Sequence, residues 1–508
     1  MREIYEIDTD KIDQIDSDNN IYHERQKIVD AVESIKDYSS EVTIFVLAYN
    51  KIENTRRCIE SVLKYTKGIS YDLILMDNGS DDETYEYFKS IKHDKIRIVR
   101  VNKNRGIGIT AFFLDMRWIS KYYVTLANDI IVTENWLDNL LAVAKSDEKI
   151  GIVNPMSSNV SNIQGYDIDF TDFDDMQEKA KRFNKSDPTK WQERMRLITL
   201  GTLYTKECLL TIGWPCFDCG FSHNFGDDDV SFRARRAGYK IILAGDTWVC
   251  HNHSYSTDDQ KKFDEYNMSL SIGRENFKEK YYGVDAWDDS TNYVSEFIDN
   301  YITMPPSTEN VTILGVDVRC GPPILDIKNS IRKYGIFNTK NYAFTTDSKY
   351  DVDLRTICNG AVVCDRTDFI YNSFKPDFFN YIIIGENINE YDKPEKVIRD
   401  LYSLLKPQGQ LFLSLKNTYN IFTLLETMGY DINYSAPARH YNLDAFFEKV
   451  KSMCIDIELI NNEMVSANET IINFINQIIP FASFEKFTRD TVVNKLLIEK
   501  FWFKITKR

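Results

Sequence analysis

From residue 42 onward, short apolar stretches alternate with amphipathic stretches of helical periodicity. Each apolar stretch has the length of a buried strand, and each is followed by apolar residues that recur every three or four positions. The first four are VTIFVLAY (42–49), YDLILMD (71–77), KIRIVRV (95–101) and YYVTLAN (122–128). This alternation is typical of βαβ units, so it predicts an α/β fold built on a Rossmann-like sheet with mainly parallel strands.

The chain of 508 residues is longer than one hydrophobic core normally organises, so we expect more than one domain. The alternating pattern restarts after MPPSTEN (304–310), which is typical of a linker. We predict an N-terminal helical arm over 1–40, a first α/β domain over 41–300, a second over 308–465 and a C-terminal helical tail over 466–508. The tail ends in the basic, aromatic IEKFWFKITKR, which fits either a docking helix or a helix on a membrane surface.

The composition argues against several classes of protein. The net charge of -15 argues against a nucleic-acid partner, because such a partner needs a basic face. No apolar run has the length of a membrane span and the N-terminus is too acidic for a signal peptide, so we expect a cytoplasmic protein. The nine cysteines include no paired CxxC motifs, which predicts free thiols rather than a zinc site.

Polar residues gather where the first four apolar strands end. They are AYN (48–50) with Glu53, DNGSDDE (77–83), NKNRGIG (102–108) and NDI (128–130). Because ligands of parallel sheets bind beyond the carboxyl ends of the strands, we expect these residues to form one site. Asp77 can accept hydrogen bonds from a base or a ribose, and Gly79 lets a ligand approach the backbone.

Three consecutive carboxylates, Asp227, Asp228 and Asp229, precede an arginine-rich helical stretch. Adjacent carboxylates repel one another and raise one another's pKa unless a cation, a helix N-terminus or a proton-transfer role compensates. Capping of the helix explains one or two of them. The third favours a catalytic role, in which crowding raises the pKa of a base toward the working range.

Five of these motifs together resemble the GT-A nucleotide-sugar transferases of glycosyltransferase family 2. The motifs are VTIFVLAYNKIE, LILMDNGSDDET, NKNRGIG, LANDIIVTENWL and GDDDVSFRARRAGYK, within residues 42–256. The resemblance implies inverting transfer from a nucleotide diphosphate sugar, assisted by Mn²⁺ or Mg²⁺. By matching positions, it implies that Tyr49, Glu53 and Asp77 hold the nucleobase and ribose, and that Arg105 lies near the diphosphate.

The metal motif departs from the family pattern. Asn128 stands where the first aspartate of the DxD motif often is, so it joins the donor-binding residues and Asp129 is the matching acid. Few protein ligands are needed when phosphate oxygens and water complete the shell of a hard cation. His251 in TWVCHNHS matches a metal-binding histidine of many relatives, and a buried, hydrogen-bonded histidine is the other interpretation.

The resemblance also implies the catalytic base. Counting back from RRAGY places Asp227 at the position of the base and Asp229 at that of the second acid. Gly226 stands where a glutamate is usual, which leaves the register open by one residue. The base removes the proton of the acceptor hydroxyl as the anomeric carbon is attacked from the face opposite the diphosphate.

The stretch over 379–417 resembles class I S-adenosylmethionine methyltransferases, through an apolar strand, an acid-bearing loop, a helix and LLKPQG. That family needs a glycine-rich turn after the first strand because backbone must approach the cofactor closely. Here VDVRCGPP supplies Arg319, Gly321 and Pro323. We therefore predict reduced or absent binding of S-adenosylmethionine, and a role in acceptor binding or assembly.

These observations predict a glycosyltransferase with a GT-A domain, a mixed Rossmann-like sheet, followed by a class I methyltransferase-like Rossmann domain. UDP-N-acetylglucosamine or another UDP-hexose is the first candidate donor, and dTDP-rhamnose is the second. The acceptor is a polysaccharide or a protein hydroxyl, as in flagellin, and both fit glycosylation in a bacterial cytoplasm. A bifunctional glycosyl and methyl transferase and a non-catalytic sugar-nucleotide-binding scaffold are the alternatives.

Overall fold

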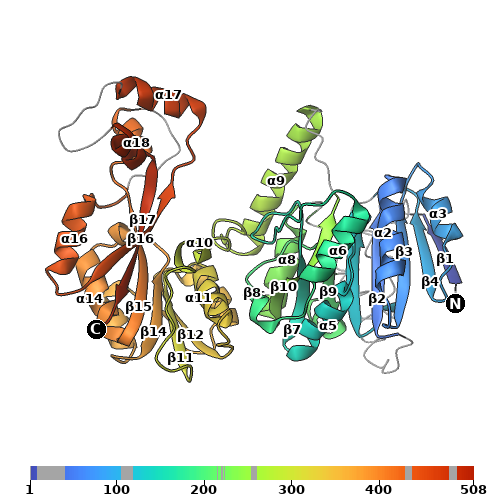
Figure 1. The fold of residues 1–508 in the computed structure, drawn as a ribbon, viewed down its shortest axis with the longest axis horizontal. Coiled ribbons are helices and arrows are strands. Elements are labelled where there is room, and N and C mark those ends of the chain that lie inside the picture. The colour runs from blue at the N-terminus through green and yellow to red at the C-terminus, as the bar shows by residue number, and fades with distance from the viewer. Residues whose placement is uncertain are drawn as a thin grey trace. The chain divides into compact units, whose positions relative to one another are not determined.

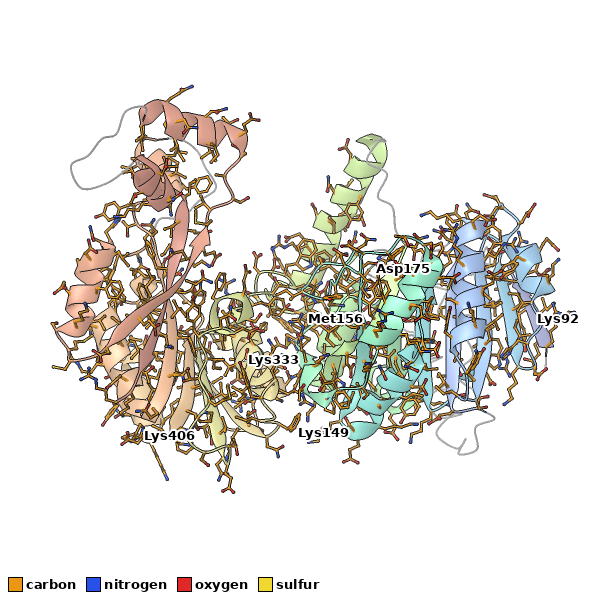
Figure 2. All side chains as sticks on the ribbon, viewed as in Figure 1. Lys92, Lys149, Met156, Asp175, Lys333 and Lys406 are labelled. Atoms are coloured by element: carbon orange, nitrogen blue, oxygen red, sulfur yellow. The ribbon has the colours of Figure 1, made fainter. Side chains whose placement is uncertain are left out.

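A computed structural model gives the fold of the chain (Figure 1). It describes residues 2–8, 40–104, 118–213, 216–218, 221, 224–252, 260–429, 437–479 and 489–508. The chain divides into two compact units, Met1–Thr291 and Asn292–Arg508. Each unit has its own sheet and hydrophobic core, and Figure 2 shows the side chains that fill them.

The first unit is built on a ten-stranded mixed sheet in the order β1-β4-β3-β2-β5-β9-β7-β10-β6, with β8 paired to β10. The strands are β1 (Arg2–Ile7), β2 (Val42–Ala48), β3 (Tyr71–Asn78), β4 (Ile96–Val101), β5 (Tyr122–Ala127), β6 (Ile130–Ile131), β7 (Ile150–Ser157), β8 (Trp191–Arg194), β9 (Thr202–Thr205) and β10 (Lys240–His251). The strands from β1 to β5 pair in parallel, whereas β9 is antiparallel to β5 and β7. The prediction of a mixed α/β sheet is confirmed.

Helices cover both faces of this sheet. They are α2 (Ile52–Tyr65), α3 (Thr84–Ser90), α5 (Trp136–Ser146), α6 (Phe173–Phe183), α7 (Lys206–Ile212), α8 (Gly226–Arg236) and α9 (Gln260–Lys280). Ile44 and Val46 of β2 join the core with α2, α3 and α5, whereas Phe45 joins the core with α7 and α8. Because alternate residues of a strand face opposite sides, burial on both faces explains the unbroken apolar run of β2.

The N-terminal segment begins with a strand, not with a helical arm. Arg2 to Ile7 form the edge strand β1, in parallel register with Ile96 to Val101 of β4. Exposed and half-buried side chains alternate along it, which is the period of a strand with one covered face. The helical pattern that we predict within 1–40, in ERQKIVDAVESI, lies outside the described residues.

The second unit is built on a seven-stranded sheet in the order β13-β12-β11-β14-β15-β17-β16. The strands are β11 (Val311–Val316), β12 (Thr339–Thr345), β13 (Val362–Cys364), β14 (Phe379–Ile384), β15 (Leu405–Lys416), β16 (Ile457–Met464) and β17 (Ile498–Thr506). The first five in that order pair in parallel, and β17 is antiparallel to both its neighbours. The prediction of a second α/β sheet with mainly parallel strands is confirmed.

Nine helices of the described residues accompany this sheet. They are α10 (Ser295–Ile298), α11 (Pro322–Arg332), α12 (Asp351–Ile357), α13 (Ile370–Ser373), α14 (Pro394–Leu404), α15 (Ile421–Thr427), α16 (Leu443–Lys451), α17 (Glu469–Ile478) and α18 (Arg489–Leu497). Val397, Ile398 and Leu401 of α14 pack into the core of the sheet. The apolar face of α14 recurs at helical spacing, which is why this stretch was recognisable from its periodicity.

The end of the predicted helical tail is a strand. Residues 469–478 and 489–497 are helical, but Ile498–Thr506 is β17, inserted between β15 and β16. Phe501, Trp502 and Phe503 are buried in the second unit. Both interpretations of this stretch, a docking helix and a membrane-surface helix, are therefore wrong for 498–506. Within the described part of the chain, no helix combines the length and apolar character that crossing a membrane requires.

Candidate active site

Hydrogen bonds join the loops that follow β2 and β3 at the carboxyl edge of the first sheet. The backbone N–H of Asn50 donates to Ser80 Oγ at 2.9 Å, and Asn50 Oδ1 accepts from the N–H of Asp81 at 2.9 Å. The N–H of Ile52, in the first turn of α2, donates to Asp82 Oδ2 at 3.0 Å. The two polar strand ends therefore hold each other in place, as one site requires.

Tyr49 and Glu53 lie beside these loops and are open to solvent. Tyr49 is 42% exposed. The Glu53 side chain is 72% exposed, and its nearest described cation is Arg56, with 4.0 Å between Oε1 and Nε. Both side chains are free to meet a ligand at the carboxyl end of β2. Arg105, which the resemblance places near the diphosphate, lies outside the described residues.

Asp77 is wholly buried at the end of β3. Its Oδ1 accepts from the N–H of Ser80 at 2.9 Å, whereas Oδ2 lies 3.5 Å from Arg100 Nε and has no hydrogen-bond partner. Burial raises the pKa of Asp77, while the hydrogen bonds from Ser80 and the charge of Arg100 oppose the rise. A buried acceptor without a hydrogen bond is destabilising, so Oδ2 is suited to accept one from a ligand.

Asn128 is hydrogen-bonded to the turn between β2 and α2. Its Nδ2 donates to the carbonyl of Asn50 and to Thr55 Oγ1, both at 2.9 Å. These bonds tie the end of β5 to the turn between β2 and α2. In this position the amide nitrogen of Asn128 helps to order the turn that follows Tyr49.

Asp129 and His251 come together because β6 pairs antiparallel with the end of β10, with Ile130 opposite His251. Asp129 Oδ2 lies 3.6 Å from His251 Nε2, and the two side chains are only 13% and 12% exposed. His251 Nδ1 donates to the carbonyl of Asn159 at 3.1 Å. Because the carbonyl can only accept, Nδ1 supplies the proton of this hydrogen bond, and Nε2 is the ring nitrogen that faces Asp129.

This pair fits a divalent cation. A carboxylate oxygen and an imidazole nitrogen face one another, and the other ring nitrogen is anchored by a carbonyl, as is usual for histidine ligands. The described residues contain no group of three or more potential metal ligands. Two protein ligands are enough when phosphate oxygens and water supply the others. His251 is thus hydrogen-bonded through Nδ1 and faces Asp129 through Nε2. The two interpretations of this histidine, a hydrogen-bonded residue and a metal ligand, are therefore compatible.

Asp227 lies in the first turn of α8 and keeps part of its surface exposed. Its Oδ1 accepts a hydrogen bond from the hydroxyl of Thr199. Burial raises the pKa of Asp227 to about 6, the hydrogen bond from Thr199 lowers it, and the charge of Asp228 raises it. A partly open carboxylate with this pKa is suited to accept a proton near neutral pH.

The other two acids of the triplet are enclosed and paired. Asp228 is 3% exposed and forms an ion pair with Arg196, which opposes the rise that burial causes in its pKa. Asp229 is fully buried. Its partners are Arg233 Nε at 2.8 Å, the Tyr281 hydroxyl at 2.8 Å and Lys280 Nζ at 2.6 Å. Asp229, a predicted catalytic acid, therefore lies within the packing of α8, and Asp227 is the acid of the pair that a substrate can reach.

A loop after β7, residues 158–165, connects the pair of Asp129 and His251 to the three acids at the start of α8. The carbonyl of Asn159 orients His251, and Asn162 Oδ1 accepts from Arg196 Nη1 at 3.1 Å. Arg196 in turn pairs with Asp228. Neither this loop nor Thr199 is predicted from the sequence. The signal for the loop is a pair of asparagines, Asn159 and Asn162, whose φ of 51° and 63° lie in the left-handed region, where asparagine is enriched.

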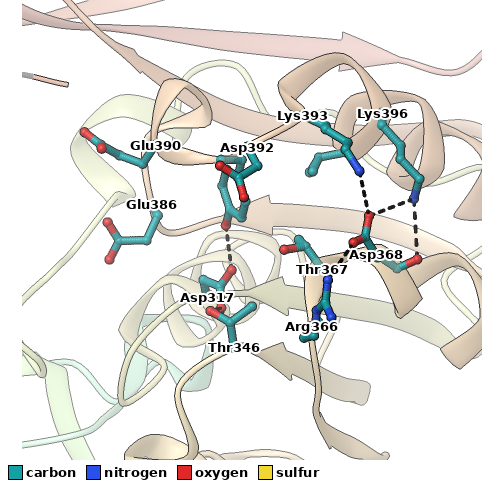
Figure 3. Close-up of a pocket in the computed structure, with 12 residues that line it drawn as sticks. Asp317, Thr346, Arg366, Thr367, Asp368, Glu386, Glu390, Asp392, Lys393 and Lys396 are labelled. Atoms are coloured by element: carbon teal, nitrogen blue, oxygen red, sulfur yellow. Dashed lines mark hydrogen bonds and ion pairs between the residues drawn. The ribbon is translucent and has the colours of Figure 1, made fainter. Parts of the chain in front are cut away.

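The second sheet has a cavity of about 540 Å³ at its carboxyl edge (Figure 3). It is lined by Asp317, Thr346, Arg366, Thr367, Asp368, Glu386, Glu390, Tyr391, Asp392, Lys393, Lys396 and Val397. Asp317 Oδ1 accepts from the N–H and the hydroxyl of Thr346 at 2.7 and 2.9 Å, and Oδ2 accepts from the Tyr391 hydroxyl at 2.7 Å. Arg319 Nε donates to Glu386 at 3.3 Å. The polar groups at this edge thus satisfy one another.

These residues do not fit S-adenosylmethionine. Arg319, with φ of 55°, occupies a position where the methyltransferase turn needs glycine, and its side chain is held by Glu386. Pro322 and Pro323 open α11 without N–H donors. The fold itself favours glycine at position 321, because its φ of 102° strains any side chain and a Cβ there would lie 2.0 Å from Ile357 Cδ1.

Comparisons with known proteins bear on the first unit. The sequence model described as glycosyl transferase family 2 matches residues 43–209, which confirms the resemblance there. The succinoglycan biosynthesis protein ExoO of Rhizobium meliloti (strain 1021) is 32% identical over 72 residues, 14% of this chain and 20% of that protein's length. The chain therefore spans about a fifth of that relative.

Two solved structures match more loosely. A mannosyltransferase of Pyrobaculum calidifontis, in complex with GDP-Man and Mn²⁺, covers 51% of this chain and 71% of its own, with 12% identity and a TM-score of 0.34. A SAM-dependent methyltransferase of Archaeoglobus fulgidus covers 46% and 98%, with 14% identity and a TM-score of 0.28. At these identities and TM-scores, neither match supports a statement about the substrates of this chain.

Proposed function

We propose that the chain is a metal-dependent, inverting glycosyltransferase whose first unit carries the reaction. It moves a sugar from a nucleotide diphosphate sugar to a hydroxyl of a polysaccharide or of a protein such as flagellin. The observation that carries this proposal is Asp227, a partly open carboxylate whose pKa is raised to about 6. The loop 158–165 connects its neighbour Asp228, through Arg196, to the pair of Asp129 and His251.

Asp77, Tyr49 and Glu53 hold the nucleoside in this proposal. Asp77 Oδ2 accepts a hydrogen bond from an N–H of the base, which supplies the partner that this buried oxygen lacks. Uracil and thymine both present such a donor, so UDP-N-acetylglucosamine or another UDP-hexose, and secondly dTDP-rhamnose, fit Asp77 equally. The choice between them depends on the sugar pocket. Arg105 is assigned to the diphosphate by resemblance alone.

Asp129 Oδ2 and His251 Nε2 would hold Mn²⁺ or Mg²⁺. A bound cation supplies positive charge to the diphosphate leaving group. The carbonyl of Asn159 holds Nδ1, so Nε2 faces Asp129 without rearrangement and would offer its lone pair to the cation.

Asp227 acts as the general base. Its carboxylate takes the proton of the acceptor hydroxyl while the hydroxyl oxygen bonds to the anomeric carbon. The bond from that carbon to the diphosphate breaks on the opposite face, which inverts the configuration. A pKa of about 6 leaves the group ionised at neutral pH and still basic enough to take the proton.

The second unit contributes acceptor binding or assembly in this proposal. The Arg319–Glu386 pair and the engaged carboxylate of Asp317 disfavour the bifunctional alternative, because they occupy the groups that a methyl donor would need. The scaffold alternative draws on Asn128, whose amide nitrogen supports a turn where the DxD motif has an acid.

A donor panel tests the function. UDP-N-acetylglucosamine, UDP-glucose, UDP-galactose, dTDP-rhamnose and GDP-mannose are incubated with the protein in Mn²⁺, in Mg²⁺ or in chelator, and released nucleotide is measured. We expect turnover of a UDP- or dTDP-sugar only with a divalent cation. Turnover that is undiminished in chelator contradicts the metal assignment, and turnover of none of the donors supports the scaffold alternative.

A further inference from the structure

Four large apolar side chains are exposed in the segment 163–173, IQGYDIDFTDF, which joins β7 to α6 and which we name the aromatic loop. They are Ile163, Tyr166, Phe170 and Phe173, at 53%, 48%, 41% and 39% exposure. A cluster of exposed rings is uncommon on a monomeric surface and marks a contact with a ligand or partner. None of these residues enters the donor site described above.

The aromatic loop is fixed to β7 and to β10, the strand that ends in His251. The N–H of Tyr166 donates to the carbonyl of Ser157 at 2.9 Å, and its carbonyl accepts from Trp248 Nε1 at 2.8 Å. Ser157 ends β7, and Trp248 lies on β10 three residues before His251. Figure 2 labels Met156 near the end of β7 and Asp175 on α6, which bracket the loop. Tyr166 is therefore held close to the ends of both strands.

Phe173 connects the aromatic loop to α2. The guanidinium of Arg57 lies 4.9 Å from the centre of its ring. One turn earlier on the same face of α2, Asn54 Oδ1 accepts from Asn252 Nδ2 at 3.4 Å. Because Asn252 follows His251, one face of α2 contacts both the end of β10 beside His251 and the aromatic loop.

The backbone of the aromatic loop is anchored where it enters α6. Asp172 caps α6 by accepting from the N–H groups of Asp174 and Asp175, at 3.0 and 2.9 Å. The rings of Phe170 and Phe173 are stacked, with 6.5 Å between their centroids. Little conformational entropy is then lost when a ligand covers these rings, which favours binding.

We propose that the aromatic loop is a docking platform for a neutral glycan, the acceptor of the proposed transfer. Exposed aromatic faces suit the apolar faces of sugar rings, and the exposed carboxylates of Asp167 and Asp169 can accept hydrogen bonds from sugar hydroxyls. This inference rests on the proposed function, because it assigns a role to the platform beside that donor site.

A basic peptide fits the aromatic loop less well than a neutral glycan. Asp172 is already engaged by the helix N-terminus, and Asp175 by Lys179 at 2.8 Å. Arg57 already lies over the ring of Phe173. Two of the carboxylates and one aromatic face that a cationic chain would use are thus satisfied within the protein, which leaves Asp167 and Asp169 as the other exposed acids of the loop.

The test measures binding to the full-length protein of cellohexaose, chitohexaose, mannohexaose, maltohexaose and, as a cationic competitor, hexalysine. The double variant Tyr166→Ala/Phe170→Ala is compared with wild type and with Tyr282→Ala, which removes an aromatic side chain that is 89% exposed in the first unit. We expect at least one oligosaccharide to bind the wild type and Tyr282→Ala alike. Its affinity should fall by about tenfold or more in the double variant, since two stacking contacts are lost.

Binding of UDP with Mn²⁺ is measured in parallel and separates the two proposals. If UDP fails to bind the wild type while oligosaccharide binding depends on Tyr166 and Phe170, the proposed function fails and the platform stands. The platform is overturned if no oligosaccharide binds, if hexalysine alone binds, or if the double variant, with unchanged thermal unfolding, binds glycan as wild type does.

Discussion

Replacing Asp227 with asparagine should remove the general base and keep the fold. Transfer should fall by about 10² to 10⁴-fold, whereas donor affinity should persist because Asp77 and Asp129 hold the nucleotide in the proposed site. In the wild type, kcat/KM should rise with pH through about 6 and then level off, because only the ionised form of Asp227 accepts a proton. The variant should lack this rise.

The same substitution should stabilise the folded protein. Burial raises the pKa of Asp227 from 3.8 to about 6, so the folded state binds more protons than the unfolded state between these values. The stability that the group contributes is therefore lost as pH rises through this window. At about 1.4 kcal/mol per pKa unit, the loss approaches about 3 kcal/mol at pH 8 and roughly half of that at pH 5. Asparagine does not ionise, so its free energy of unfolding should exceed that of wild type most at pH 8.

The neighbouring acids are matched controls with the opposite expected sign. Asp228→Asn leaves the buried guanidinium of Arg196 without its counter-charge, and Asp229→Asn removes the buried carboxylate that pairs with the half-buried Arg233. Breaking a buried ion pair from one side is destabilising by about 3–5 kcal/mol. Within one triplet, asparagine should therefore stabilise the protein at the first position and destabilise it at the next two.

Urea unfolding of the first unit at the two pH values, with kcat/KM profiles for all three variants, provides the measurements. An Asp227→Asn variant that transfers sugar normally would refute its role as base. A dead but stable Asp228→Asn beside an active Asp227→Asn would instead place the base one residue later, the alternative that Gly226 leaves open. Equal destabilisation by all three substitutions would show that Asp227 is as firmly paired as its neighbours.

Three further outcomes are expected. His251→Ala should raise the Mn²⁺ concentration for half-maximal turnover by about tenfold or more, measured by metal titration; an unchanged titration would remove His251 from the site. Calorimetry should show no tight binding of S-adenosylmethionine to the wild type, and a micromolar isotherm or methyl transfer would restore the bifunctional alternative. Phe503→Ala should lower the free energy of unfolding of the second unit by about 3–5 kcal/mol, because the ring is fully buried in β17; a loss near zero would contradict its place in the core.

The sheets were predictable because burial on both faces leaves a direct signature. Along β2, Ile44 and Val46 pack on one side and Phe45 on the other, so the strand is apolar without interruption. The C-terminal strand β17 has no comparable signature in the sequence. Lys500 and Lys504 interrupt its aromatic residues, and each pairs with a glutamate of β16 across the sheet, at 3.0 and 2.9 Å. Pairing between segments that are distant in sequence is not encoded in the local period that identifies a helix or a strand.

The candidate site was predictable from the sequence only where the functional group is a side chain of a distinctive type. Asp77, Asp129 and Asp227 are carboxylates at strand ends or at the start of a helix, and their chemistry is readable from the residue type. The group that orients His251 is the backbone carbonyl of Asn159, which any residue could provide. Thr199 is a single hydroxyl in a loop without a motif. Partners of this kind become visible only when the fold brings the segments together.

The structure also changes the reason why three carboxylates can stand in a row. We expected crowding by neighbouring charges to raise the pKa of the base. Burial is instead the largest cause for Asp227, and the charge of Asp228 ranks below it. The pairs that Asp228 and Asp229 form with arginine explain this, because a neutralised neighbour repels little. The triplet therefore combines two acids that anchor α8 with one whose basicity is set by its enclosure, and each acid requires a different compensation.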